Sequence, residues 1–444
     1  MKKLGFACLA VLTSATAVQA QDAGAASVLE LNYILSSFAM LVFGILVMMM
    51  AVGFTMLEAG FVRKKNVVMQ LTKNVGLFVI AAICFFAAGY GLMRADGSWL
   101  IQGLVGTPGP LDLGPVSADA GAAPGQKVTQ GSDFFFQMMF CAAAASIVSG
   151  ALAERVRLWA FFVFVAVLTG FLYPIGASWA WADGGFLAAQ FGFKDFAGST
   201  VVHSAGGWAA LAGAIVVGPR LGKYTNDGYP PAMPPSNMTL AVLGMFFLWF
   251  GWFGFNAGSL GSMDSAEDIG KISRIFVNTA LAGAAGAVAA LLFTKTLFRR
   301  VDTTMVMNGT LAGLVAITAE PVLPSSEGAL IIGAIGGLIA CFGIMTLDRL
   351  RVDDVVGAIP VHLMSGIWGT IAVIFSNPDA TLLGQLAGVV AIGGLIFIPS
   401  LIVWRVIAWT VGARAHPEDE QDGLDVSELG AEAYPEFADA RLAS

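Results

Sequence analysis

The sequence predicts an all-α polytopic membrane protein with eleven transmembrane helices, arranged as an inverted repeat of five plus five helices and an eleventh helix. Hydrophobic residues make up 57% of the 444 residues and charged residues only 12%, about half the charged fraction of a soluble domain. Long apolar segments recur along the chain, and two of them contain a histidine in the same local pattern. The net charge of −7, without any basic stripe, gives no indication of nucleic-acid binding.

The first twenty residues have the pattern of a cleaved signal peptide. Lys2 and Lys3 form a positive region, residues 4–12 an apolar core, and residues 18–20 a small-residue cleavage site. An uncleaved first helix is the alternative, but the apolar core is too short to span a bilayer. We therefore expect cleavage after Ala20, with the mature chain beginning on the outer side of the membrane.

Eleven later segments are apolar over the roughly 20 residues that a membrane crossing needs. The least regular are the eighth, which contains Asn308, and the last, which is longer than one crossing requires. The expected segments are 32–57, 67–93, 133–153, 157–182, 197–218, 238–260, 273–297, 303–320, 327–347, 356–375 and 381–411.

The basic residues predict the orientation of these segments. They gather on alternate connections, as in residues 63–65 and residues 295–300, and such connections face the cytoplasm. The N-terminus is therefore expected outside, and the acidic segment 412–444 is expected to be a cytoplasmic regulatory tail. The transporter domain would span residues 21–411.

Two of the three histidines lie in apolar segments within matching patterns, in which an acid precedes the histidine by eight residues and a glycine follows it by four. The matching positions are Asp195, His203 and Gly207 in the fifth segment, and Asp354, His362 and Gly366 in the tenth. Because five is an odd number, the second set of five helices must run opposite to the first. Such inverted repeats place a substrate path near the middle of the membrane.

A histidine inside a membrane is costly and therefore indicates function. A pair of imidazoles can share a proton and present a donor and an acceptor nitrogen to a small polar molecule. Two imidazoles alone are a thin set of metal ligands, and no CxxC or HExxH motif is present, so neither a cofactor nor enzymatic activity is expected. Asp354 fits helix capping best. For Asp195, attraction of a cation is an equal alternative.

The sixth segment contains the run GWFGFNAGS at 251–259. Phe255 and Ser259 are four residues apart and share one helix face, so a ring and a hydroxyl could narrow a pore, although ordinary packing explains the pair equally well. Trp179 and Trp181 fit an interfacial belt, or rings that hold a cation through their faces. The abundant glycines favour close helix packing.

Several long motifs, in one consistent order, resemble those of the ammonium transporter family (Amt/Mep/Rh), specifically its bacterial Amt branch. The motifs are EAGFVRKKN at 58–66, QMMF at 137–140, GALAER at 150–155, DFAGSTVVH at 195–203, GWFGFNAGS at 251–259, RVDD with a later VH at 351–362, and GLDVSELGAEAY at 423–434.

This resemblance implies a homotrimer in the bacterial inner membrane, with one ammonium pore per subunit and a tail that meets a PII-type signalling protein. It implies an outer cation site of Phe140, Trp181 and Ser259, a gate of Phe140 and Phe255, pore histidines His203 and His362, and Asp195 as the acid that supports recruitment and deprotonation of ammonium. Gly357, Leu429 and Ala431 depart from the family pattern, and the last two lie in the tail.

The sequence therefore leaves three hypotheses about function. The leading one is ammonium transport, in which ammonium loses a proton and ammonia crosses a dry pore. The others are an ammonium sensor and a neutral gas channel of the Rh kind. A short tail argues against the sensor, and Trp181 with Ser259 argues against the gas channel. Whether the proton crosses with the ammonia stays open from the sequence.

Overall fold

The computed structural model describes residues 2–95, 98–114, 127–224 and 233–437, with helix side chains described from Val28 onward. The expected cleavage-site side chains, Pro230 and Pro231 of the second long loop, part of the loop 94–131 and the last seven residues of the tail lie outside the described residues.

Within that described part, nine helices are long and apolar enough to cross a membrane. They are Val28–Phe61, Lys64–Met93, Gln130–Ala151, Leu158–Phe191, Ser199–Val217, Met238–Gly258, Ala266–Phe298, Ser326–Arg349 and Leu382–Thr410. Two shorter apolar helices, Thr303–Ile317 and Ile359–Phe375, correspond to the predicted eighth and tenth segments. All eleven predicted segments are thus helical, while the count of eleven crossings stays a prediction.

Several of these spans are divided by local changes in helix geometry. The α-helices are α1 (Lys2–Phe61), α2 (Val67–Cys84), α3 (Tyr90–Met93), α4 (Gln130–Ala151), α5 (Leu158–Val167), α6 (Tyr173–Trp181), α7 (Phe186–Phe191), α8 (Ala205–Val217), α9 (Met238–Gly258), α10 (Ala266–Phe298), α11 (Thr303–Ile317), α12 (Ser326–Arg349), α13 (Ser365–Ala372), α14 (Leu382–Thr410), α15 (Pro417–Asp422) and α16 (Leu424–Leu429). The other elements are the π-helical turns η2 (Phe85–Gly89), η3 (Leu168–Leu172), η4 (Ser199–Ser204) and η5 (Ile359–Met364), the 3-10 turns η1 (Lys64–Asn66), η6 (Val373–Phe375) and η7 (Pro435–Phe437), and the antiparallel strands β1 (Trp99–Ile101) and β2 (Val105–Gly106).

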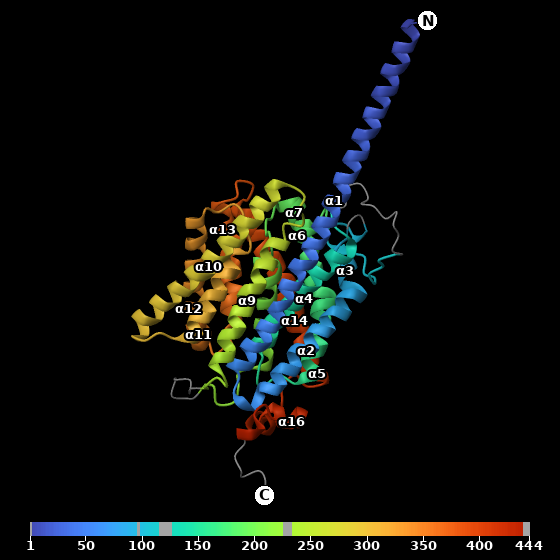
Figure 1. The fold of residues 1–444 in the computed structure, drawn as a ribbon. Helices are drawn as coiled ribbons and strands as arrows, with labels where there is room; N and C mark the ends of the chain where they lie inside the picture. The colour runs from blue at the N-terminus through green and yellow to red at the C-terminus, as the bar shows by residue number, and fades with distance from the viewer. Residues whose placement is uncertain (1, 96–97, 115–126, 225–232, 438–444) are drawn as a thin grey trace.

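The helices form one bundle, with the two chain termini at opposite ends (Figure 1). Helix α1 is continuous from Lys2, and its first part extends beyond the bundle. Helices α15 and α16 lie at the other end, here called the tail end; the opposite end is called the far end. Glycines let the helices approach closely, as the sequence predicts: a Cβ on Gly286 of α10 would lie only 2.2 Å from the carbonyl oxygen of Gly309 in α11.

The described part of the acidic tail is bound to the bundle through its carboxylates. Asp425 accepts a hydrogen bond from the backbone N–H of Met69 (2.7 Å), at the start of α2, and Glu428 accepts one from Leu158 (3.0 Å), at the start of α5. Glu420 accepts one from the backbone N–H of Leu221 (2.6 Å), just after α8. The first N–H groups of a helix lack partners within the helix, so the tail completes two helices of the bundle.

Candidate pore

Each histidine of the predicted pair lies in a π-helical turn that follows an aspartate cap. Asp195 accepts hydrogen bonds from four backbone N–H groups, those of residues 198–201, at 2.8–3.0 Å. Asp354 accepts three, from residues 357–359, at 2.7–3.1 Å. Both carboxylates therefore act as helix caps, and the matched eight-residue spacing places His203 in η4 and His362 in η5. Turns of this kind are frequent at functional sites.

The glycine four residues after each histidine allows the two histidine helices to cross. A Cβ on Gly207 would lie 2.7 Å from the backbone nitrogen of Leu363, which follows His362. A Cβ on Gly366 would lie 2.4 Å from the carbonyl oxygen of Ser199, within the turn that carries His203. Both distances are too short for a side chain, so each glycine is required for the approach of the opposite histidine.

The crossing brings the two imidazoles together inside the protein. Their Nδ1 atoms are 3.2 Å apart, and the rings are nearly parallel, with an interplanar angle of 20°. His203 is 0% and His362 3% exposed. When both are neutral, one Nδ1 must carry the hydrogen and the other must accept it. The buried Nε2 of His203 has no hydrogen-bond partner in the described structure, which makes it a ready contact for a small polar molecule.

A stack of aromatic rings continues from His203 toward the far end. Phe255 of α9 stacks on His203 with ring centroids 5.2 Å apart, and Phe140 of α4 stacks on Phe255 at 3.8 Å and 14°. Both phenylalanines are buried, at 1% and 0% exposure. The two rings predicted as a gate are thus stacked on each other, with Phe255 next to His203.

The other residues of the expected cation site contact these two phenylalanines. The ring of Trp181 meets Phe140 edge-on at 6.3 Å, and its Nε1 donates to the carbonyl oxygen of Asp195 (2.8 Å). The hydroxyl of Ser259 donates to the carbonyl of Phe255 (2.9 Å), so its oxygen lone pairs remain available as acceptors. Trp181 and Ser259 are only half-buried. Asp195 contacts Trp181 through its backbone carbonyl, because its carboxylate binds the N–H groups of residues 198–201.

Two cavities lie between the histidines and the tail end. A small one of about 10 Å³ is lined by His362, Glu58 and Asn308, among others. A wider vestibule of about 300 Å³ is lined by Asn308, Gly357, Arg220 and further residues of the tail end. Asn308 and Gly357 line both cavities, which are therefore neighbours.

Two residues in contact with the histidine pair were not identified from the sequence. Trp252 stacks on His203 at 4.9 Å and donates from Nε1 to the hydroxyl of Thr318 (2.8 Å). Phe54 lies 6.0 Å from His362. Trp252 precedes Phe255 by three residues on one helix face, which was a usable signal. Nothing in the local sequence distinguishes Phe54 from a packing residue.

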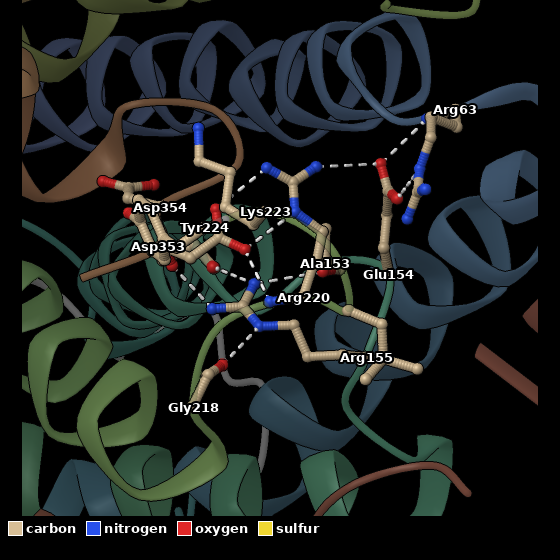
Figure 2. Close-up of polar contacts among 12 residues, drawn as sticks. Arg63, Ala153, Glu154, Arg155, Gly218, Arg220, Lys223, Tyr224, Asp353 and Asp354 are labelled. Carbon is tan, nitrogen blue, oxygen red and sulfur yellow. Dashed lines mark hydrogen bonds and ion pairs between the residues drawn. The ribbon is translucent and has the colours of Figure 1, made fainter. Parts of the chain in front are cut away.

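Beyond the pore, the GALAER and RVDD motifs meet in a group of charges, the tail-end ion network of Arg63, Glu154, Arg155, Arg220 and Asp353 (Figure 2). Arg220 binds Asp353 through two nitrogens, at 2.8 and 2.9 Å, and Glu154 at 3.2 Å. Arg63 also pairs with Glu154. Burial alone would raise the pKa of Asp353, but Arg155 and Arg220 hold that pKa well below its usual range. The network ties Asp353, in the segment before the His362 helix, to Arg220, in the segment after the His203 helix.

This fold and site define a class: a polytopic helical membrane protein with a buried histidine pair beside a stack of aromatic rings. Among the described residues, no group of three or more His, Cys, Asp or Glu is placed to hold a metal ion. Comparison with known proteins identifies the family. The model of the Ammonium Transporter Family matches residues 38–434, and the chain belongs to this family, whose members are transporters or channels rather than enzymes.

Individual relatives agree with this assignment. The chain is 39% identical over 425 residues to the ammonium transporter Amt2 of Archaeoglobus fulgidus, covering 89% of this chain and 87% of the relative. Among solved structures, it resembles a sensor Amt protein with a TM-score of 0.82 and 34% identity, covering 90% of this chain and 99% of the other. It also resembles Mep2 of Candida albicans, with a TM-score of 0.76, 26% identity and 91% of each chain covered.

Proposed function

We propose that this protein transports ammonium across the bacterial inner membrane through a pore centred on His203 and His362. The observation that carries this proposal is the buried 3.2 Å contact between their Nδ1 atoms, directly below the stacked rings of Phe140 and Phe255. The family membership supports ammonium as the substrate.

Recruitment takes place at the far end. The ring faces of Phe140 and Trp181 attract a cation, at about 0.5–2 kcal/mol per ring, and the oxygen of Ser259 accepts a hydrogen bond from it. Potassium has the same charge and a similar size but no hydrogen to donate, so the hydroxyl favours ammonium. Asp195 contributes by placing its carbonyl on Trp181 and by adding negative charge beside the site.

The gate and the histidines then separate ammonia from ions. Phe140 and Phe255 must move apart for passage, because their rings are in contact at 3.8 Å. A bare ion cannot cross the apolar section without a large desolvation cost. Ammonium can lose a proton at the outer side, and the remaining ammonia can hydrogen-bond to the buried Nε2 of His203. The histidine pair can pass the proton separately.

The wider assembly completes the proposal. All eleven helices cross the membrane with the N-terminus outside, after removal of residues 1–20. Three copies form a trimer, and the cytoplasmic tail, residues 412–444, meets a PII-type partner. Because Leu429 and Ala431 depart from the family pattern, transport is the main proposal and binding of the partner is the secondary one.

The test uses purified protein in liposomes, with charge movement and internal pH recorded after pulses of ammonium and, as a control, potassium. We expect an ammonium-only response that is lost when both His203 and His362 are replaced by alanine. Wild-type activity and selectivity in that double variant would refute the role of the histidine pair. Silence of the wild-type protein in both measurements would favour the sensor over the transporter.

A further inference from the structure

The carboxylate of Glu58, in α1, is fully buried and unevenly satisfied. Its Oε2 accepts hydrogen bonds from Ser149 (2.7 Å), from Asn74 (2.8 Å) and from Gln70. Its Oε1 is buried without any hydrogen-bond partner in the described structure. Buried polar atoms without partners are uncommon and call for an explanation. Oε2 therefore anchors this side chain, and Oε1 stays available as an acceptor.

Glu58 also lies beside a cavity between the histidines and the tail end. Glu58 and His362 line the same cavity of about 10 Å³, which has room for about one water molecule. That cavity shares Asn308 and Gly357 with the vestibule of about 300 Å³. Glu58 is thus the carboxylate that lines the cavity beside His362, and the vestibule, with carboxylates of its own, follows.

A positive charge lies next to Glu58 but does not bind its carboxylate directly. Lys73 of α2 is 1% exposed and donates to the carbonyl oxygen of Ser149 (2.8 Å), the residue whose hydroxyl donates to Glu58. Ser149 therefore links the two charges, and they attract each other across it. The other ionisable groups near this pair are His362, on the opposite wall of the cavity, and Arg155, which acts on Lys73. An anchored carboxylate without a direct ion pair can take up and release a proton while its position stays fixed.

We propose that Glu58 is the proton acceptor that follows the histidine pair in the pore. The inference rests on the proposed ammonium transport. The proton that ammonium loses at the outer side is taken up by the pair. The protonated pair then passes a proton from His362, through one water in the small cavity, to Oε1 of Glu58. The resulting carboxylic acid releases the proton to water in the vestibule and returns to its anionic form. The ammonia crosses separately, so one proton and one ammonia arrive for each ammonium taken up.

The test replaces Glu58 with glutamine in the full-length protein. Glu58→Gln keeps the shape of the side chain and an oxygen for the Oε2 contacts, but it removes the proton acceptor. In liposomes we expect the ammonium-evoked current to fall by roughly 10²-fold, the scale for a positioned proton-transfer group, while ammonia entry, recorded by internal pH, persists. Glu58→Asp should restore part of the current. A purely structural role predicts equal loss of both signals.

A second buried glutamate provides the matched control. Glu320 is 8% exposed and accepts from Asn377 (3.0 Å), yet it lines neither cavity. Glu320→Gln should keep the current. An undiminished current in Glu58→Gln, or equal loss of current and ammonia entry in correctly assembled protein, would overturn the inference. Wild-type uptake without charge movement would also overturn it but leave transport standing, whereas no wild-type uptake at all would refute the proposed function.

Discussion

Replacing Gly366 with alanine tests whether the close helix crossing creates the histidine pair. The new Cβ would lie 2.4 Å from the backbone oxygen of Ser199 and 2.5 Å from the hydroxyl of Ser204. The hydroxyl can rotate away, but the backbone oxygen belongs to a capped turn and cannot. Reaching an ordinary contact requires a shift of about 1 Å between the two helices.

The magnitude follows from this shift. An extra methyl group in a packed interior costs about 1–3 kcal/mol, so Tm in detergent should fall by several degrees. The same shift would carry the two Nδ1 atoms from 3.2 Å to about 4 Å, outside hydrogen-bond range. Ammonium-evoked current in liposomes should then be largely lost, even at temperatures where the variant is folded.

The control is Gly394→Ala in α14, where nothing lies within 4 Å of the added carbon. Alanine is the better helix former by about 0.5–1 kcal/mol, so this variant should be at least as stable as the wild type and fully active. If Gly366→Ala behaves like Gly394→Ala in both assays, the crossing does not depend on the glycine and the reasoning is wrong.

Two further predictions concern buried carboxylates. Asp195→Asn leaves some of the four N–H groups that Asp195 binds without an acceptor, which costs about 1–3 kcal/mol for each group. Both Tm and transport should therefore fall. As a control, Asp183→Asn, on an exposed side chain, should change neither. Asp353→Asn breaks a buried ion pair and should destabilise by about 3–5 kcal/mol. Since the arginines lower the pKa of Asp353, this stabilisation is complete above its ordinary pKa of about 3.9 and is lost as the pH falls through the lowered value. The difference in Tm between Asp353→Asn and the wild type should stay constant from pH 5 to 8 and shrink only below about pH 4. A difference that disappears near neutral pH would contradict this reasoning. As a control, Asp379→Asn, on an exposed side chain, should have the Tm of the wild type.

The sequence was informative where a position needs a particular residue type for a local reason. The Asp-His-Gly spacing was visible because each member has a distinct requirement: a cap, a ring and a close approach. Phe140 and Phe255 lie on different helices, and only the resemblance of their motifs connected them. The structure adds the 3.8 Å stack that makes them a closed layer.

What the sequence left open depended on contacts between distant segments. Glu58 appeared only as the first letter of a motif, because its partners Asn74 and Ser149 come from two other helices. Asp354 was expected to be a cap and is one. For Asp195 the cap is present, whereas attraction of a cation stays a prediction, since it depends on an approaching ion rather than on the fold.

The docking of the tail has a consequence for synthesis of the protein. Asp425 completes the start of α2, and Glu428 completes the start of α5, although both helices leave the ribosome long before the tail does. Until translation ends, the leading amides of these helices lack their final acceptors. A copy that ends before Asp425 would therefore leave the starts of α2 and α5 without these two acceptors.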